Sequence, residues 1–104
     1  GGTSLTNGAD CSGFVMSVFA QFGYSLPRVA ADQYYQSVQK SVADLEPGDL
    51  VFYGSGISHV ALYIGDGQII HASTSASGIK ISNYDYETPV GVGTYIESDG
   101  FYGE

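Results

Sequence analysis

The sequence contains few of the residues that would indicate a disulfide scaffold, a metal cluster or a negatively charged partner. Among 104 residues there are one cysteine, no tryptophan, and three Lys or Arg residues against eleven Asp or Glu residues, a formal net charge of -8. One cysteine excludes an intrachain disulfide and disfavours a thiolate metal cluster. Nucleic acids and anionic membranes both require clustered positive charge, so neither is expected as a partner. No apolar run approaches the ~20 residues of a transmembrane helix, so no membrane insertion is expected.

The residues that are present fit a single folded domain. Apolar residues make up 43% of the chain and charged residues 13%, a composition too apolar for intrinsic disorder. A chain of this length buries roughly 60–70% of its unfolded surface, enough for one core. We therefore expect residues 1–104 to form one domain, and we expect that domain to be a monomer.

The clearest periodicity begins after a start rich in Gly, Ser and Thr, which indicates a loop. Apolar residues then recur at i, i+3, i+4, i+7, i+8 and i+11, the spacing of one helix face. These residues are Cys11, Phe14, Val15, Val18, Phe19 and Phe22. Asp10 is a suitable N-cap and Gly23 a suitable C-terminal stop. The pattern predicts a helix that begins at Cys11 and ends before Gly23.

A short helix and then a series of short strands are predicted in the rest of the chain. The helix is expected over Ala30–Ser37. Gly- and Pro-containing turn signals separate the apolar runs that follow. The predicted strands are Leu50–Tyr53, His59–Ile64, Gln68–Ser73, Ile79–Ser82 and Val90–Ile96. A helix followed by antiparallel strands indicates the α+β class, with the first helix packed on the sheet.

The single cysteine lies where a helix favours a thiolate. Cys11 falls in the first turn of the predicted helix, where unpaired backbone N–H groups and the helix dipole lower a thiol pKa from about 8.5. The N–H of Ser12 is a candidate donor to an oxyanion that forms on substrate. The alternative is a buried cysteine that serves only as a small apolar residue.

The two histidines of the chain lie on consecutive predicted strands, and the loop between these strands decides their relative orientation. A two-residue loop at positions 66–67 would place the imidazoles on opposite faces, because side chains alternate along a strand. A three-residue loop at positions 65–67, with its last glycine left-handed, would place Ile64 opposite Gln68 and both imidazoles on one face. A catalytic pair requires the second arrangement, so we predict the three-residue loop.

Two imidazoles on one face would supply the base that a cysteine nucleophile needs. His59 would accept the thiol proton, and His71 would orient and polarise His59. The alternative is a two-histidine metal site, but two imidazoles without a further ligand bind zinc poorly. Tyr63 shares the strand face of His59 and is predicted to line the substrate site. Most of the nine Tyr residues are instead expected to fill sheet positions.

An ordered set of motifs resembles a known enzyme family. The motifs are Asp10-Cys11-Ser12-Gly13-Phe14-Val15, Leu26-Pro27-Arg28, Gln33-Tyr34, Leu45 to Tyr53, His59 to Gly65, and Ile70-His71-Ala72-Ser73. Together they resemble the catalytic domain of the NlpC-type cell-wall cysteine peptidases. The resemblance implies a small papain-like fold, in which a helix that carries the Cys packs on an antiparallel sheet that carries both His residues.

The resemblance also implies an activity and the residues that carry it. Family members hydrolyse peptide stems of bacterial peptidoglycan, commonly between D-glutamate and a diamino acid, by a thiol mechanism that needs no cofactor and no metal. By position, Cys11 would be the nucleophile, His59 the base and His71 the third polar residue. The residues implied as substrate contacts are Asp10, Ser12, Arg28 and Ser58. The expected location is the extracytoplasmic side, secreted or in the cell wall.

This sequence departs from the family pattern at one place, and two alternative functions remain open. The family usually carries a Tyr-x-Trp-Gly-Gly stretch before the Cys, and this chain starts at the Gly-Gly, so we expect a catalytic domain that lacks its N-terminal segment. One alternative is a non-catalytic module of the same fold that binds peptidoglycan. The other is a related papain-like amidase or acyltransferase that uses the same Cys and His residues on a different substrate.

Overall fold

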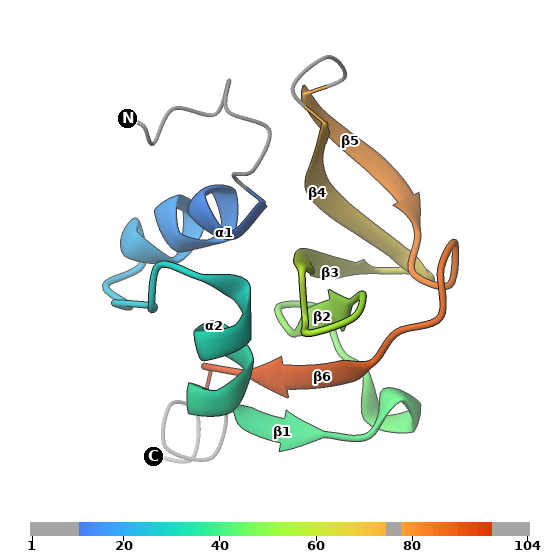
Figure 1. Ribbon diagram of the computed structural model, residues 1–104, viewed down its shortest axis with the longest axis horizontal. Coiled ribbons are helices and arrows are strands. Elements are labelled where there is room, and N and C mark those ends of the chain that lie inside the picture. Colours follow the sequence, from blue (N-terminus) through green and yellow to red (C-terminus); the bar gives the residue numbers. More distant parts are fainter. Residues whose placement is uncertain (1–10, 75–77, 97–104) are drawn as a thin grey trace.

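A computed structural model describes residues 11–74 and 78–96. Two helices precede the six strands, and the helices lie together on one side of a curved sheet (Figure 1). The elements are α1 (Cys11–Ala20), α2 (Ala30–Gln36), β1 (Val38–Lys40), a 3₁₀ turn (Val42–Asp44), β2 (Leu50–Tyr53), β3 (His59–Gly65), β4 (Gln68–Thr74), β5 (Gly78–Asn83) and β6 (Gly91–Thr94). Neither helix is long and apolar enough to cross a membrane.

The strands form one six-stranded antiparallel sheet in the order β1-β6-β2-β3-β4-β5. The helix packed on an antiparallel sheet confirms the predicted α+β class. Strand β1 was not predicted, because its residues are polar or exposed and it lies at the edge of the sheet. The predicted strand Val90–Ile96 is shorter in the structure, where β6 covers Gly91–Thr94.

Helix α1 ends as the sequence predicts but buries fewer residues. The N–H of Gly23 bonds to the carbonyl of Ala20, and the N–H of Tyr24 bonds to the carbonyl of Phe19. With Gly23 at φ +88°, this is a Schellman cap. The prediction that Phe22 belongs to the buried face is wrong, since the helix has ended and the side chain is 75% exposed. The predicted N-cap Asp10 lies outside the described residues.

Strand β2 is buried on both sides, which explains its uninterrupted apolar sequence. On one face Leu50 and Phe52 pack with residues of α1, among them Val15. On the other face Val51 and Tyr53 belong to a second cluster that includes residues of β3, β4 and β6. The strand next to β2 carries His59, so this candidate base is attached to the most buried part of the sheet.

Two glycines of β6 allow α2 to lie close to the sheet. A side chain at Gly91 would collide with the ring of Tyr34, and one at Gly93 would collide with the side chain of Ser37. The close approach brings the C-terminal half of α2 onto β6 and holds the helical layer against the strands.

The loop between β3 and β4 is shorter than predicted. Gly65 pairs with Gln68, so the loop has two residues, Asp66 at φ +56° and Gly67 at φ +75°. Positive φ at both positions is the mark of a type I′ turn, which suits the twist of a two-residue hairpin. The prediction of a three-residue loop is therefore wrong.

A bulge in β3 nevertheless produces the predicted register. Between Tyr63 and Gly65 the pairing shifts by one residue, and beyond the shift Tyr63 pairs with Ile69 and Leu62 with Ile70. These are the partners that a three-residue loop would have given. The extra residue, Ile64, thus returns the two histidines to one face of the sheet.

Candidate active site

The nucleophile candidate is the first described residue of α1. Cys11 is 6% exposed, and its Sγ lies 4.0 Å from the backbone oxygen of Ser58. Ser58 immediately precedes His59, the first residue of β3. The contact therefore brings the start of the helix to the start of the strand that carries the candidate base.

The two histidines are in direct contact, as the sequence predicts. Nε2 of His59 and Nδ1 of His71 are 2.7 Å apart, and the ring centroids are 5.0 Å apart in an edge-to-face arrangement. Since Nε2 of His59 is engaged by His71, Nδ1 is the ring nitrogen left to accept the thiol proton. The other nitrogen of His71, Nε2, lies 3.1 Å from Oγ of Ser82 on β5.

Burial sets the charge of both imidazoles. It lowers the pKa of His59 below the ordinary 6.5, and the negative charge of Glu87 partly opposes this effect. Burial and the charges of His59 and Lys80 lower the pKa of His71 to about 4. Both rings are therefore neutral at pH 7, the state in which His59 can accept a proton.

Two tyrosines that the sequence analysis did not single out lie beside the histidines. The ring of Tyr53 is 5.9 Å from His59, and the ring of Tyr86 is 5.4 Å from His71 and 5.2 Å from Tyr53. The Tyr53 hydroxyl donates to the carbonyl of Tyr84, which fixes the segment after β5. Tyr86 is 48% exposed. Burial, Glu87 and the charge of Cys11 raise the pKa of Tyr86, so this ring, which lies against His71, is also within electrostatic range of the thiol.

The first turn of α1 is attached to the segment that leads into α2. Arg28 donates from a terminal guanidinium nitrogen to Oγ of Ser12 at 3.0 Å. The fully buried Gln33 donates to the backbone oxygen of Ser12 at 3.1 Å and to that of Pro27 at 2.8 Å. The structure thus brings together Ser12, the residue after Cys11, and Arg28, two of the predicted substrate contacts. Gln33 supports the same turn of α1. In the sequence, only its place in the Gln33-Tyr34 motif indicated that this residue matters.

The remaining predicted contact residues are more scattered. Ser58 is exposed beside Cys11. Tyr63 lies near the other end of β3, where its hydroxyl accepts a hydrogen bond from the N–H of Gly67 at 2.9 Å. Its ring also meets Tyr84 edge-on at 6.2 Å. Tyr63 thus fastens the β3–β4 turn, and Asp10 lies outside the described residues.

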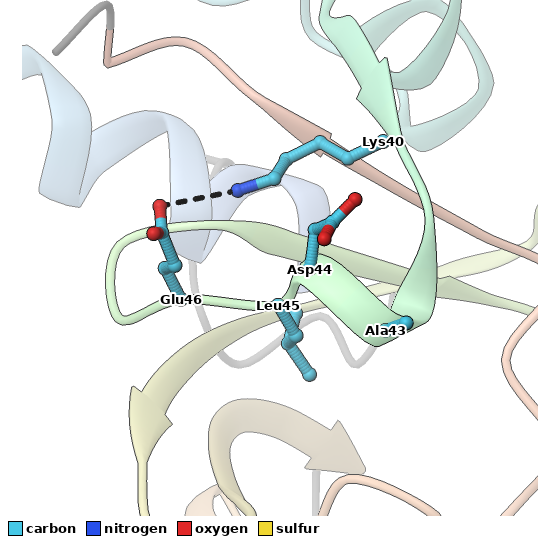
Figure 2. A pocket seen from close by; sticks show the side chains of 5 residues that line it. All are labelled: Lys40, Ala43, Asp44, Leu45 and Glu46. Carbon is cyan, nitrogen blue, oxygen red and sulfur yellow. Dashed lines mark hydrogen bonds and ion pairs between the residues drawn. The ribbon is translucent and has the colours of Figure 1, made fainter.

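A shallow pocket on the molecule lies at the other end of β2 from His59. It is lined by Lys40, Ala43, Asp44, Leu45 and Glu46 (Figure 2). Lys40 pairs with Glu46 at 3.4 Å and with the buried Asp49 at 2.6 Å. Burial alone would lower the pKa of Lys40, but its contacts with the two carboxylates outweigh burial and raise it. These contacts hold the turn before β2.

The described residues contain no group of three or more His, Cys, Asp and Glu side chains arranged to hold a metal ion. The two imidazoles are in contact, and the thiol of Cys11 lies against the residue before His59, so these three side chains are candidates for a nucleophile, a base and a group that orients the base. The arrangement can carry out acyl transfer through a thiol.

Comparison of the sequence with known proteins identifies relatives over most of the chain. The NlpC/P60 family matches residues 1–93. The probable endopeptidase p60 of Listeria innocua is 51% identical over 76 residues, which are 71% of this chain and 16% of that protein. The gamma-DL-glutamyl hydrolase of Bacillus subtilis is 40% identical over 89 residues, which are 85% of this chain and 21% of that protein. The chain therefore spans a small part of the length of these relatives.

Solved structures share the fold. The peptidoglycan hydrolase RipB from Mycobacterium tuberculosis has a TM-score of 0.79 at 40% identity, covering 85% of this chain and 45% of RipB. RipD from the same organism, described as a non-catalytic NlpC/p60 domain protein adapted to peptidoglycan binding, has a TM-score of 0.75 at 26% identity, covering 84% of this chain and 67% of RipD. Since the fold occurs in a hydrolase and in a non-catalytic protein, the site residues must decide between these activities.

Proposed function

This chain belongs to the NlpC/P60 family, and from that premise we propose that it is a cysteine endopeptidase domain that hydrolyses peptidoglycan stem peptides. The observation that carries the proposal is the contact of 2.7 Å between His59 and His71, with the thiol of Cys11 lying 4.0 Å from the backbone oxygen of Ser58, the residue before His59. A protein that only bound peptidoglycan would have no need of a base in contact with a second imidazole next to a thiol.

The names of the relatives support the substrate class. RipB is named a peptidoglycan endopeptidase, and the Bacillus subtilis relative is named a gamma-DL-glutamyl hydrolase. On this basis the scissile bond we propose is the one between the γ-carboxyl of D-glutamate and a diamino acid. Action on the cell wall places the domain outside the membrane, secreted or wall-associated, and we propose that it acts there as a monomer.

The proposed reaction begins with transfer of the thiol proton of Cys11 to Nδ1 of His59. The thiolate attacks the scissile carbonyl, and the carbonyl oxygen takes up the negative charge beside the N–H of Ser12. His59 then gives its proton to the leaving amine as the C–N bond breaks, which leaves a thioester on Cys11. Water, deprotonated by His59, hydrolyses the thioester and restores the thiol. His71 orients His59 throughout.

The substrate-binding set that we propose consists of Asp10, Ser12, Arg28, Ser58 and Tyr63. Ser58 lies against Cys11, whereas Tyr63 lies near the other end of β3. The contact between Arg28 and Ser12 supports this set, because it places a guanidinium next to the nucleophile. A guanidinium is suited to a carboxylate, a group that stem peptides carry.

The second candidate function is a non-catalytic peptidoglycan-binding module, which the structural likeness to RipD favours. In this case Cys11, His59 and His71 would be retained only as packed side chains. Such a module would bind muropeptides and leave them intact.

Digestion of purified muropeptides, read by mass spectrometry, tests the two candidates. We expect the wild-type chain to release products cut after D-glutamate, and Cys11→Ala to cleave at least ~10³-fold more slowly, since the residual rate then comes from binding alone. Ser17→Ala, an exposed substitution on the same helix, serves as the matched control and should cleave at the wild-type rate. Binding of muropeptides by a folded wild type without cleavage would instead establish the binding module.

A further inference from the structure

The inner histidine of the pair makes a second polar contact that the proposed reaction does not use. His71 is 2% exposed, and both of its ring nitrogens have partners. Nδ1 lies 2.7 Å from Nε2 of His59, and Nε2 lies 3.1 Å from Oγ of Ser82. Three groups therefore form a continuous chain of polar contacts, from the imidazole of His59 through that of His71 to the hydroxyl of Ser82.

The sheet register directs this hydroxyl toward the imidazole. On β5, Ser82 pairs with Ile69, and Lys80 pairs with His71. Paired residues point to the same face of a sheet, and so do residues two apart on one strand. Ser82 is therefore the diagonal neighbour of His71 on the face that carries both imidazoles.

The chain of contacts allows two proton arrangements, and only one of them lets His59 act as a base. If Ser82 donates to His71, then His71 must carry its proton on Nδ1 and donate it to Nε2 of His59. A neutral His59 then carries its own proton on Nδ1, the nitrogen left for the thiol, and cannot accept another there.

In the other arrangement each ring donates its hydrogen bond toward Ser82, so that His59 donates to His71 and His71 donates to Ser82. His71 carries its proton on Nε2 and donates it to Oγ of Ser82. Its unprotonated Nδ1 then accepts the Nε2–H of His59, which leaves a lone pair on Nδ1 of His59 for the thiol proton. The imidazolium that forms keeps its Nε2–H bonded to His71.

We propose that Ser82 is a positioning residue that holds His71 in the Nε2-protonated tautomer by accepting its hydrogen bond. The inference deepens the proposed function and rests on it for its catalytic consequence. Ser82 touches neither substrate nor thiol in this role, and it acts only through His71.

The tautomer can be measured directly by ¹⁵N nuclear magnetic resonance of the histidine rings at pH 7, without substrate. We expect the wild type to show His71 protonated on Nε2 and His59 protonated on Nε2. Ser82→Ala should raise the Nδ1-protonated population of His71, because the Nε2–H loses its acceptor, whereas Ser82→Thr keeps the hydroxyl and should keep the tautomer. A wild-type His71 protonated on Nδ1 would overturn the inference.

Kinetics on muropeptides supply the second readout. We expect Ser82→Ala to lower kcat about tenfold with KM within about twofold of wild type, a loss of about 1.4 kcal/mol that lies within the range for one hydrogen bond. Ser82→Thr should recover most of the loss. Asn83→Ala, an exposed substitution of the next residue on β5, is the control for a general disturbance of the strand. An equal loss in Ser82→Thr and Ser82→Ala would contradict the positioning role.

The titratable and charged groups around His59 and His71 determine how these rates change with pH. Apart from Ser82, the groups that affect or contact the two rings are Tyr53, Lys80, Tyr86 and Glu87, and Cys11 in turn affects Tyr86. None of them is changed in the Ser82 variants, so a difference between the variants reports on the hydroxyl. If the wild type fails to cleave muropeptides, the proposed function fails, while the tautomer measurement still decides the role of Ser82.

Discussion

At the scale of single residues, the charge of His59 decides when the thiol can be activated. The ring must be neutral to accept the thiol proton, and it is neutral only above its own pKa. Burial lowers that pKa below 6.5, and Glu87 partly restores it because a nearby carboxylate stabilises the imidazolium. The two effects have opposite signs, and burial is the larger.

The acid limb of the activity profile should therefore respond to Glu87. Activity should rise with pH around a midpoint below 6.5, and Glu87→Gln should move that midpoint to still lower pH, because it removes the charge that favours the imidazolium. At pH 7 the rate should stay within about twofold of wild type, since exposed charges contribute little there. The measurement is kcat/KM on muropeptides across the acid range. Glu46→Gln, which changes a carboxylate next to Lys40, is the control, and a shift to higher pH in Glu87→Gln would contradict the sign.

The sequence allowed the candidate reacting groups and the contact of the two histidines to be predicted, but not their surroundings. Cys11 is marked by its place at a helix start, and the two histidines are marked by their place on consecutive strands. Tyr86 and Ser82 carry no such mark. They meet His71 because β5 pairs with β4 and because the segment after β5 folds back on Tyr53. Contacts of this kind depend on the packing of separate strands rather than on a local pattern.

At the scale of elements, the bulge in β3 connects the loop to the site. A two-residue hairpin without the bulge would place the two histidines on opposite faces, and the extra residue Ile64 restores the shared face. The sequence analysis predicted the correct register of β3 against β4 but attributed it to a three-residue loop. The requirement that both imidazoles meet determines the register, and either a longer loop or a bulge can produce it. A bulge in a chain of alternating side chains leaves no simple sequence signal.

Deletion of Ile64 should therefore remove the catalytic pair. The deletion forces either a slip of β3 against β4 or a slip of β3 against β2, since β3 pairs with both strands. We expect hydrolysis to fall at least ~10²-fold, the size of effect that follows misplacement of catalytic groups by about an ångström.

Ile64→Ala keeps the bulge and removes only a side chain that is 41% exposed, so its rate should stay within about threefold of wild type. Muropeptide cleavage compares the two, and the His59–His71 contact can be followed by nuclear magnetic resonance. An active deletion variant would show that the register does not depend on Ile64.

At the scale of the whole molecule, the sheet is covered by helices on one face and carries the two imidazoles on the other, together with Tyr53 and Tyr86. The second face buries a titratable group, His71, at 2% exposure within the folded structure. Burial disfavours the protonated form of this ring, so a protonated His71 must lose its proton when the chain folds. The site and the stability of the fold are therefore linked through one ionisation.

The sign of that linkage follows from the direction of the pKa change. The pKa of His71 is lowered from 6.5 to about 4 on folding, so between these pH values the unfolded chain binds more protons than the folded one. Stability is then highest above pH 6.5 and falls as the pH drops toward 4. The loss from this one group reaches ~3 kcal/mol, with a slope of at most ~1.4 kcal/mol per pH unit.

Urea unfolding measured at a series of pH values would test this linkage. We expect the free energy of unfolding of the wild type to decrease steadily from pH 7 to 4. In His71→Gln, whose side chain does not titrate, the decrease should be smaller by about the same ~3 kcal/mol, whatever the variant loses in absolute stability at pH 7. Buried His59 still titrates in the variant and leaves a residual slope of the same sign. If the free energy of unfolding changed equally with pH in the two proteins, the pKa of His71 would be the same in the folded and unfolded chains. His71 would then not be held neutral beside His59 by burial.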